Sequence, residues 1–572
     1  MVHVFVTIFR RDLRVYDNTA LEHCFASATE EAKKSGHPVT VLPVFFYRED
    51  QTNPERNPYF GEPAFGMLNE SVNDLDAQLS AKRSPSALVF IRRLKRIAVP
   101  LHPPHRGVAD SIDALANAEA EALSRVCREE ESTSSRPPCL HVFFNRDVTP
   151  YSRQRDSALV SALFSAAARN VAPKHKKKSD QSATAILAEV QGWFEDYTLF
   201  PMDDPLTKSR SGSFYTVFKF LYDKRRELHQ RVPRLPSSSS FHPPTTEDVE
   251  GFDTSPRQKA LHILNAVATG QFDDYEDTRN DLARDVKGTS TTRLSRFLKF
   301  GCISIREVYW AAYRAASNQN RRFDHGTDHP LIRELYFREF YYIVAWFRPD
   351  VLKGMTDAGA KNIAFHAELD ANIPWTDVSS EKGAYLLEAW KHGRTGVPIV
   401  DAGMRQLLNT GFMHNRCRMI TAMFLTKDLL IDWREGELHF ARHLVDYDPV
   451  QNNAGWQWSA SVGNDAAPYF RIFNPFLQQA RFDPDGIFTT YWVPELATLV
   501  RTAKTSGGIL SKWDDPRVRA LLRENASRVK TIPIVAHEYP DPIVSHKESA
   551  DVAKHAFSRA AVREKKREKP RG

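Results

Sequence analysis

The segment HVFVTIFRRDLRVYDNTALEHCFASATEEAKK occupies residues 3–34 and joins two different hydrophobic patterns. Its first part, HVFVTIF, is a short apolar run rich in β-branched and aromatic residues, which predicts a buried strand. Its last part, TALEHCFASATEEAKK, has the pattern of a helix. The same alternation continues with the runs VTVLPVFF, ALVFI and LHVFF. Strands that alternate with helices predict a doubly wound α/β domain with a parallel sheet over residues 1–200.

The second half of the chain has a different pattern. After residue 200 strand-like runs are scarce, and long segments with helical spacing dominate, such as PLIRELYFREFYYIVAWF, AYLLEAWKHG and RMITAMFLTKDLLIDWREGELHFARHLV. We therefore expect a large all-α domain over residues 256–545. The Pro- and Ser-rich stretch RVPRLPSSSSFHPPTTEDVEGF (231–252) predicts an exposed linker within residues 201–255. Residues 546–572 are expected to form a basic C-terminal tail.

Composition limits the class of protein. The 572 residues allow two to four domains of roughly 100 to 200 residues each. The five cysteines are scattered and contain no CxxC pair, so neither a disulfide framework nor a zinc site is expected, and the compartment should be reducing. No run of about 18 uncharged apolar residues occurs, which argues against a secreted or membrane-spanning protein. The net charge of +7 permits a polyanionic partner without requiring one.

Two basic stretches look like insertions, RRLKRIAVPLHPPHRGVADS (92–111) and APKHKKKSDQ (172–181), and both are expected to be exposed loops. The second contains the lysine run KHKKK (174–178), and a further basic run, REKKREKPR (563–571), lies near the C-terminus. Such runs could be nuclear import signals, phosphate contacts or solvated surface. We expect an intracellular protein located in the nucleus, with the cytoplasm or an organelle as alternatives.

The stretch NNAGWQWSASVGNDAAPYFRIFNP, from Asn452 to Pro475, combines indoles with amides. It belongs to a region rich in tryptophan, because five of the ten tryptophans fall between residues 375 and 458. A single tryptophan is usually a core filler. If GWQWSAS is helical, however, Trp456 and Trp458 lie about 200° apart around the axis and must serve two surfaces. One indole can then face a buried cofactor while the other lines a cavity.

A second group of polar residues lies in MHNRCRMI, from Met413 to Ile420. On a helix, Asn415, Arg418 and Met419 share one face. The flanking residues are apolar, and a buried arginine requires an anion or a carboxylate. Asp446 and Asp448 are the candidates nearby in the sequence. The alternative for these two aspartates is a turn that ends a helix, and the spacing alone leaves both interpretations open.

A third group is GTSTTRLSRFLKFGCIS, from Gly288 to Ser304. Hydroxyl groups just before a helix, together with the free N–H groups of its first turn, can hold a phosphate. Simple helix capping is the commoner explanation for such a run. Neither GxGxxG nor GxxxxGK[ST] occurs in the chain, so any nucleotide cofactor must be held in another way.

Together with FRRDLRVYDNTAL (9–21), NRDVTPYSRQRD (145–156), RELYFREF (333–340), GRTGVPIVDAGMRQL (393–407) and YPDPIVSHKE (539–548), these motifs resemble the photolyase/cryptochrome family, most closely its class I cyclobutane pyrimidine dimer photolyases. The resemblance covers almost the whole chain. It implies an N-terminal antenna domain and a C-terminal helical domain that holds FAD in a folded conformation. The active state would be reduced FADH⁻. A second antenna chromophore is implied as well, and methenyltetrahydrofolate, deazaflavin and flavin all remain open.

The resemblance also implies a light-dependent repair enzyme, a deoxyribodipyrimidine photo-lyase, which acts as a monomer on DNA that contains pyrimidine dimers. The catalytic residues would be Glu334, Asn415, Met419 and Asn452. The residues that contact the lesion or the DNA backbone would be Arg279, Glu334, Phe337, Asn415, Arg416, Trp458, Arg471 and Gln478. Glu334 is expected to be buried, with a raised pKa that lets it donate to developing negative charge. Phe337 departs from the family, which usually has Trp there, so its stacking face is smaller.

For the cofactor, the resemblance implies contacts to FAD from Tyr275, Thr291, Thr292, Arg293, Leu294, Ser295, Arg338, Arg418, Asp446, Tyr447, Asp448 and Asn452. Asn452 would face flavin N5, where an amide can accept the N5–H bond of reduced flavin and a carboxylate would favour a neutral radical. An asparagine therefore supports a repair enzyme. Trp456, Trp433 and Trp375 would form the chain that photoreduces oxidised flavin. No metal is expected.

Three alternative functions follow from the same residues. A cryptochrome photoreceptor would usually have a long C-terminal tail, whereas this sequence ends about 24 residues after His546–Glu548. A (6-4) photolyase would have paired histidines where His414 and Asn415 stand. A plain flavoprotein or nucleic-acid-binding module would leave Glu334, Met419 and the paired indoles without a role.

Overall fold

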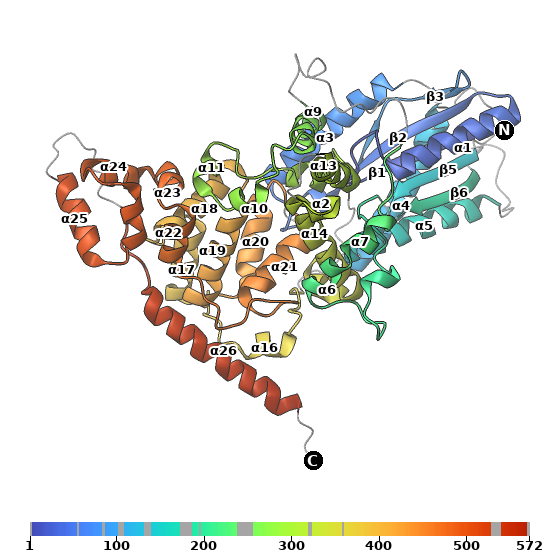
Figure 1. The fold of residues 1–572 in the computed structure, drawn as a ribbon. Helices are drawn as coiled ribbons and strands as arrows, with labels where there is room; N and C mark the ends of the chain where they lie inside the picture. Colours follow the sequence, from blue (N-terminus) through green and yellow to red (C-terminus); the bar gives the residue numbers. More distant parts are fainter. Residues whose placement is uncertain are drawn as a thin grey trace. The chain divides into compact units, whose positions relative to one another are not determined.

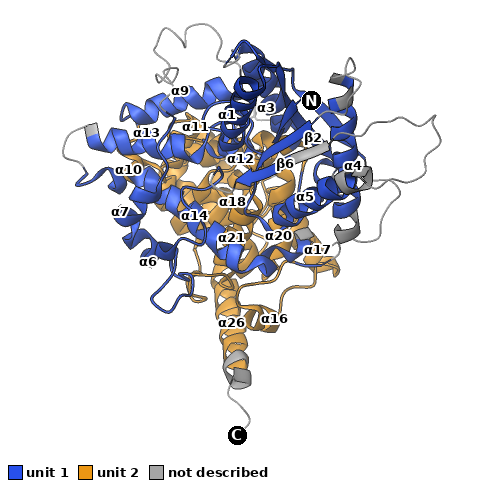
Figure 2. Cartoon of the chain, turned by 90° about the vertical axis from the view of Figure 1, so that its right-hand side faces the viewer, with its two compact units in different colours: residues 1–60, 65–271, 294–361 blue, residues 61–64, 272–293, 362–572 orange. Residues whose placement is uncertain are grey.

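The computed structural model of the protein describes residues 3–53, 56–82, 86–100, 108–130, 139–171, 186–193, 196–236, 255–318, 323–356, 360–527 and 539–568. Its contacts divide the chain into two compact units (Figure 2). Unit 1 comprises residues 1–60, 65–271 and 294–361, and unit 2 comprises residues 61–64, 272–293 and 362–572. Residues 237–252 of the Pro- and Ser-rich stretch, the insertion at 172–181 and the run KHKKK lie outside the described residues, whereas residues 201–236 of the predicted linker are described.

Unit 1 contains a six-stranded sheet in which every pairing is parallel (Figure 1). The strands are β1 (His3–Phe9), β2 (Val39–Arg48), β3 (Val89–Ile91), β4 (Lys95–Val99), β5 (Cys139–Asn145) and β6 (Ile186–Trp193). Their order is β3-β2-β1-β5-β6, and β4 also pairs with β2. The order reverses at β1, as in doubly wound folds. The predicted parallel sheet is confirmed.

Helices cover both faces of this sheet. The core under one face combines Val4, Val6 and Ile8 of β1 with Leu115 of α4 and Leu159 of α5. The opposite face of the sheet is covered by α1, which begins after Asn18. The Asn18 side chain accepts the backbone N–H of Leu21, and Gly36 ends the helix with a φ of 66°. The bounds of the unit 1 helices are α1 (Thr19–Ser35), α2 (Glu49–Thr52), α3 (Glu62–Ala81), α4 (Val108–Glu130), α5 (Pro150–Val171), α6 (Phe218–Asp223), α7 (Arg225–Leu228), α9 (Pro256–Ala268), α12 (Ser295–Phe300), α13 (Ile305–Asn318), α14 (Pro330–Phe347) and α15 (Lys353–Thr356).

The prediction that residues 92–111 form an exposed loop is wrong for the part that the structure describes. Residues 95–99 form β4, which pairs in register with the end of β2. The basic side chain of Arg96 points to solvent while Val99 is buried, so the strand is one-sided. Lys95 and Arg96 suggested a loop, but Arg96 lies on the exposed side of the strand and Lys95 is itself partly exposed. Strand β6 was not predicted either.

The described part of unit 2 is helical and contains no strand. Its helices are α10 (Tyr275–Thr278), α11 (Leu282–Val286), α16 (Ala367–Asn372), α17 (Glu381–Lys391), α18 (Pro398–Thr410), α19 (Asn415–Met423), α20 (Trp433–His443), α21 (Pro449–Ala460), α22 (Pro475–Phe482), α23 (Ile487–Trp492), α24 (Pro494–Thr502), α25 (Pro516–Ser527) and α26 (His546–Glu568). A π-helical turn, Phe424–Asp428, follows α19. The predicted large helical domain is confirmed, and the predicted domain boundaries remain predictions. Among the helices described in both units, none is long and apolar enough to span a bilayer.

Candidate functional site

Helix α19 presents the polar residues of MHNRCRMI. His414 precedes the helix, and its Nδ1 accepts the backbone N–H of Arg416 at 3.1 Å. Burial lowers the pKa of His414 to about 4, so this N-cap is a neutral imidazole at physiological pH. Asn415, the next residue, is exposed, and its Nδ2 lies 3.9 Å from the Sδ of Met419, one helical turn later. The prediction that Asn415 and Met419 share one face of a helix is confirmed.

Arg418 is paired with a carboxylate. Its Nη2 donates to both carboxylate oxygens of Asp446 at 3.1 and 2.9 Å, and its Nε donates to the Met413 carbonyl at 2.7 Å. Asp448 instead caps the start of α21, because its Oδ1 accepts the N–H groups of Val450 and Gln451. The two aspartates therefore have different structural roles. Asp446 lies in the turn after α20 and forms the ion pair, whereas Asp448 begins the next helix.

The two tryptophans of α21 occupy different environments, as their predicted 200° separation requires. Trp456 is 2 % exposed, and Trp458 is partly exposed. The Trp456 ring packs edge-on against Phe440 and Trp390, with centroid distances of 4.9 and 5.9 Å. It lies so close to Gly436 that a Cβ there would be 2.0 Å from the indole. No role was predicted for Trp390.

Asn452 lies one helical turn before Trp456 and is held by the backbone of α20. Its Nδ2 donates to the Glu437 carbonyl at 3.0 Å, which leaves the side-chain oxygen as an acceptor. The Glu437 side chain is fully buried and accepts from Nδ2 of Asn362 and of Asn453 at 2.8–3.0 Å. Burial raises the pKa of Glu437 to about 7. Nothing in DWREGELHF indicated this role for Glu437.

The other two tryptophans of the predicted electron-transfer chain also lie in unit 2. Trp433 is fully buried, and its Nε1 donates to Asp370 at 3.2 Å. The guanidinium of Arg434 lies 4.4 Å from the centre of the Trp433 ring. Trp375 is partly exposed and meets Phe557 of α26 edge-on at 6.0 Å. Nε1 of Trp375 is a buried donor without an acceptor among the described residues.

The predicted phosphate-binding residues lie close to a buried carboxylate that the sequence analysis missed. Asp285 of α11 accepts from Arg293 Nη2 at 2.7 Å and from Gln406 Nε2 at 2.6 Å. Gln406 in turn accepts the backbone N–H of His414 at 3.0 Å. These bonds connect the segment before α12 with α18 and α19.

Helix α12 lacks the side-chain cap that the hydroxyl-rich run suggested. Its N-cap residue is Leu294, with no side-chain hydrogen bond to the first turn. Plain capping of α12 is therefore not the role of Thr291 and Thr292. Tyr275, the other predicted phosphate contact, is buried at the start of α10.

Arginines gather on the side of unit 2 formed by α10, α19 and α22. Burial, followed by the positive charges of Arg279 and Arg481, lowers the pKa of Arg416. The Arg416 guanidinium donates to Asn280 Oδ1 at 3.2 and 2.9 Å and lies 4.3 Å from the Phe482 ring centre. Positive charges that are close enough to repel one another favour binding of an anion. Arg279 and Arg416 are among the residues predicted to contact DNA, whereas Arg481 was not predicted.

Arg471 and Gln478 are the other two residues predicted to contact the DNA backbone. Arg471 is exposed, and Gln478 is partly exposed on α22. The Oε1 of Gln478 is buried without a donor among the described residues.

Helix α14 of unit 1 carries Glu334, Phe337 and Arg338. The prediction that Glu334 is buried is wrong, because its side chain is 30 % exposed, with Arg333 at 4.0 Å. The Phe337 ring stacks on Phe218 of α6, with centroids 3.4 Å apart and an interplanar angle of 10°. One face of Phe337 is therefore already covered by a phenyl ring.

The buried carboxylate of α14 is Glu339. It accepts from Arg338 Nη1 at 2.7 Å and from the Leu199 N–H at 2.9 Å. Burial raises the pKa of Glu339 to about 7. Arg338, which the resemblance assigns to the flavin, is thus held in place by its neighbour in the sequence.

Comparison with known proteins identifies the family. A family model described as DNA photolyase matches residues 5–239, and one described as FAD binding domain of DNA photolyase matches residues 331–559. The deoxyribodipyrimidine photo-lyase of Escherichia coli strain K12 is 33 % identical over 558 residues, which are 95 % of each chain. The chain belongs to the DNA photolyase family. FAD is accordingly its cofactor, since the matched FAD-binding domain includes α14 and α18 to α21.

Solved photolyase structures have the same architecture. A bacterial class III photolyase from Agrobacterium tumefaciens matches with a TM-score of 0.66 and 27 % identity, covering 98 % of both chains. An archaeal photolyase from Sulfolobus tokodaii, described as containing two FAD molecules, matches with a TM-score of 0.62 and 27 % identity, covering 97 % of this chain and 99 % of that one.

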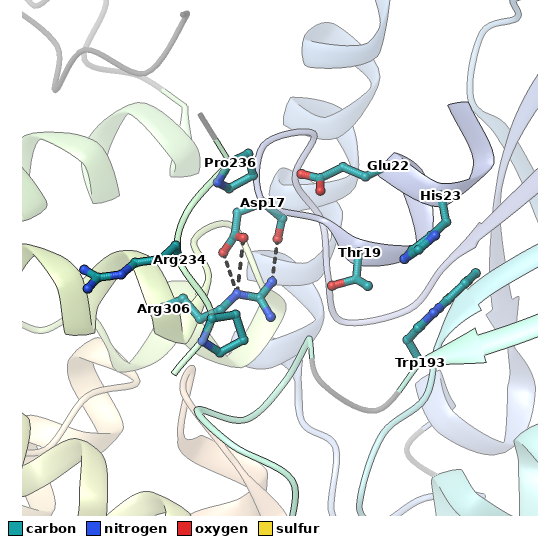
Figure 3. A pocket seen from close by; sticks show the side chains of 9 residues that line it. Asp17, Thr19, Glu22, His23, Trp193, Arg234, Pro236 and Arg306 are labelled. Atoms are coloured by element: carbon teal, nitrogen blue, oxygen red, sulfur yellow. Dashed lines mark hydrogen bonds and ion pairs between the residues drawn. The ribbon is translucent and has the colours of Figure 1, made fainter. Parts of the chain in front are cut away.

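Unit 1 of this photolyase also contains a pocket of about 480 Å³ beside the start of α1 (Figure 3). Two of its charged residues are already paired, because Arg306 Nε donates to both carboxylate oxygens of Asp17 at 3.2 and 2.9 Å. The His23 ring stacks on Trp193 with centroids 4.4 Å apart. We attribute the Asp17–Arg306 pair to the packing of the α1 entry loop on α13.

A different polar cluster lies at the carboxyl ends of β1 and β2, where doubly wound folds bind their ligands. Arg10 donates to Glu119 at 3.2 Å, and Arg48 lies 3.4 Å from the other Glu119 oxygen. Burial alone would raise the pKa of Glu119, but Arg10 and Arg48 lower it. Nε and Nη2 of Arg10 are buried donors that find no acceptor in the described part of the chain. This cluster can therefore accept further hydrogen-bond partners.

Proposed function

We propose that the protein repairs cyclobutane pyrimidine dimers in DNA in a light-dependent reaction with reduced FAD as the electron donor. Membership of the DNA photolyase family supports the reaction class. The observation that carries the proposal is the orientation of Asn452. Because its Nδ2 donates to the Glu437 carbonyl, its oxygen is presented as an acceptor, which suits the N5–H of a reduced flavin.

The residues that would hold FAD fit its chemistry. The uncapped N-terminus of α12 and the anchored segment Thr291–Arg293 offer donors for a pyrophosphate. Arg418 and Asp446 offer a fixed donor and acceptor pair for the flavin or ribose. The remaining proposed contacts are Tyr275, Leu294, Ser295, Arg338, Tyr447 and Asp448. When it is bound and excited by blue light, reduced FAD supplies one electron and later takes it back.

The lesion would be bound outside the DNA stack. Flipping a base costs a few kcal/mol, least for a damaged base, and stacking on an aromatic side chain returns about 1–3 kcal/mol. Trp458 is partly exposed and can provide such a stacking face. Phe337 would provide less, because Phe218 already covers one face of its ring.

Eight further side chains would position the dimer and the strand around it. Glu334 would donate to the dimer carbonyls, and Asn415 with Met419 would contact its edge. The arginine cluster of Arg279, Arg416 and Arg481, with Arg471 and Gln478, would bind the phosphates on either side of the lesion without reading sequence.

Three other tryptophans would serve oxidised flavin rather than the dimer. We propose electron transfer to the flavin through Trp456, Trp433 and Trp375. Exposure supports this order, because Trp456 and Trp433 are buried and Trp375, the last member, is partly exposed to solvent.

The deciding experiment illuminates the purified protein, with its flavin fully reduced, in the presence of DNA that contains cyclobutane dimers, and follows the return of thymine absorbance. Repair should require light and should fall strongly in Glu334→Ala. Glu388→Ala, which removes an exposed carboxylate from α17, should repair normally. Repair confined to (6-4) lesions would favour a (6-4) photolyase. Flavin photoreduction without any repair would favour a photoreceptor.

We also propose that a second, light-harvesting chromophore binds at the cluster of Arg10, Arg48 and Glu119. The unused donors of Arg10 and the position of the cluster at the carboxyl edge of the sheet support this site. Purified protein should be reconstituted separately with methenyltetrahydrofolate, deazaflavin and flavin, and chromophore fluorescence measured. Arg10→Met should lose the second chromophore and retain FAD, whereas the exposed-site control Arg96→Met should retain both. Equal chromophore binding by Arg10→Met and the wild type would exclude this site.

We further propose that the protein works as a monomer in the nucleus, directed there by KHKKK (174–178) and REKKREKPR (563–571). A fluorescent fusion should become diffuse when both runs are changed to alanine. Unchanged nuclear signal in that variant would refute the assignment of the runs.

A further inference from the structure

Three potential metal ligands meet at the amino-terminal end of the sheet, the edge opposite the one where doubly wound folds bind nucleotides. His3 is the first residue of β1, Cys139 is the first residue of β5, and His141 follows two positions later. In the parallel register His3 pairs with Cys139. Alternate residues of a strand point to the same face, so the three side chains converge. One donor atom from each lies within 4.8 Å of the other two.

The two imidazoles are already arranged with their ring nitrogens facing each other. His3 Nδ1 lies 3.0 Å from His141 Nε2. The second nitrogen of each ring faces a carboxylate, because His141 Nδ1 lies 3.3 Å from Glu189 of β6 and His3 Nε2 lies 3.5 Å from Glu31 of α1. A carboxylate on the outer nitrogen of a histidine is the usual support of a metal-bound imidazole, since it fixes the tautomer and the ring orientation.

We propose that His3, Cys139 and His141 bind a zinc ion. Two nitrogens and one sulfur form a ligand set that suits zinc, with Zn–N distances of about 2.0–2.1 Å and a Zn–S distance of about 2.3 Å. Tetrahedral geometry places two such nitrogens about 3.3 Å apart, so the present 3.0 Å separation needs to open by only about 0.3 Å. When the Zn–S bond forms, the Cys139 thiol loses its proton to solvent.

The fourth coordination position is open to solvent water. The histidine side chains are 20 % and 14 % exposed, which gives the ion a path to the site, whereas Cys139 is buried. Zinc bound here would tie the start of β1 to the start of β5 and, through Glu31, to α1. The sequence gave no sign of the site, because its ligands lie on two strands about 136 residues apart and form no CxxC or HxxxH pattern.

The competing explanation is a metal-free pair of hydrogen-bonded histidines, and calorimetry distinguishes the two. Untagged holoprotein should bind one zinc ion in a titration followed by calorimetry. Cys139→Ser and His141→Gln should each weaken binding at least about 100-fold, and Glu189→Gln should weaken it about 10-fold, as loss of an outer carboxylate does. The matched control His23→Gln changes an exposed histidine of the same unit and should bind zinc like the wild type.

A second measurement guards against misfolding of the variants. Cobalt substitution should give a thiolate-to-metal absorption band in the wild type and in Glu189→Gln, and none in Cys139→Ser, while the flavin spectrum of every variant shows whether it is folded. Added zinc should raise the Tm of the wild type and leave that of Cys139→Ser unchanged. Zinc affinity that is the same in Cys139→Ser, His141→Gln and the wild type would refute the site, as would the absence of zinc binding to the wild type.

Discussion

Gly436 offers a direct test of how tightly the first proposed electron-transfer tryptophan is held. A Cβ at this position would lie 2.0, 2.4 and 2.6 Å from three atoms of the Trp456 indole. An ordinary contact begins at 3.4 Å, so in Gly436→Ala the ring and the methyl group must separate by 1.4 Å, the difference between 3.4 and 2.0. Trp456 has little room to move, because Phe440 and Trp390 meet its edges and it is 2 % exposed.

The free-energy cost of this steric clash can be separated from the effect of helix propensity with a matched control. Replacing glycine by alanine inside a helix stabilises it by up to about 1 kcal/mol. Gly455 lies in α21 next to Trp456, and a Cβ there would meet nothing within 4 Å, so Gly455→Ala should show only this gain. Overpacking costs about 1–3 kcal/mol, and the fixed ring favours the upper end. The free energy of unfolding should therefore be about 1–3 kcal/mol lower in Gly436→Ala than in Gly455→Ala.

Two measurements on the same proteins check this expectation. Urea unfolding gives the difference in stability between the two variants. Illumination with an external electron donor gives the rate of flavin photoreduction, which should fall in Gly436→Ala because its indole is displaced, and should stay at the wild-type value in Gly455→Ala. Equal stability and equal photoreduction in the two variants would show that Trp456 is not held as the structure indicates.

Four further substitutions test the proposed site. Trp433→Phe should abolish light-driven reduction of oxidised FAD and leave repair by chemically reduced FAD unchanged, whereas Trp513→Phe, which replaces an equally buried indole, should alter neither. Asn452→Asp loses the hydrogen bond to the Glu437 carbonyl, worth about 1 kcal/mol, and should favour the neutral radical of the flavin in anaerobic spectra, with lower repair per absorbed photon. Arg416→Ala should reduce the slope of log affinity against log salt concentration for dimer-containing DNA by about 1, measured by fluorescence anisotropy. Burial raises the pKa of Glu437 from 4.5 to about 7, so the folded state binds this proton more tightly than the unfolded chain does. The stability that the bound proton contributes is fully present below about pH 4.5 and is lost as the pH rises through about 7. Glu437→Gln should therefore remove up to about 3 kcal/mol of the fall in unfolding free energy between about pH 5 and pH 8, measured by urea unfolding across that range.

The elements that could be predicted from the sequence are those whose pattern is local. HVFVTIF became β1 and LHVFF became most of β5, because continuous apolar runs suit a strand that is buried on both faces. The same holds for α19 and α21, where helical spacing placed Asn415 beside Met419 and separated Trp456 from Trp458. β4 was missed because Lys95 and Arg96 lie on a strand paired along one edge, where charged side chains can reach solvent.

The parts of the site that escaped prediction depend on partners distant in the sequence. In the sequence Asp285 looks like an ordinary helical aspartate, and only the structure shows that Arg293 and Gln406 donate hydrogen bonds to it. Glu437 reads as one of several acidic residues in α20, although Asn362 is bonded to it across 75 positions. Glu334 was expected to be buried because its proposed role requires it, but burial depends on what packs around a residue rather than on its type.

The mixture of indoles and amides in α21 has a physical reason that only the contacts make visible. Asn453 and Gln457 are one turn apart and bonded to each other at 2.9 Å. Asn453 also donates to the Glu437 side chain at 2.8 Å, and Gln457 accepts the Phe365 N–H at 2.8 Å. These amides fix α21 against α20 and against the loop that contains Phe365. Burying them costs free energy that apolar side chains would not, because each buried polar group needs a hydrogen-bond partner. As a result, Asn452 and Trp456, which precede Asn453 and Gln457 in the sequence, are held in fixed orientations. The reaction begins with a short-lived excited state, so the side chains around the flavin must already be in position before light is absorbed. The buried amides of α21 hold them there, and Trp458 lies on the partly exposed side of the same helix.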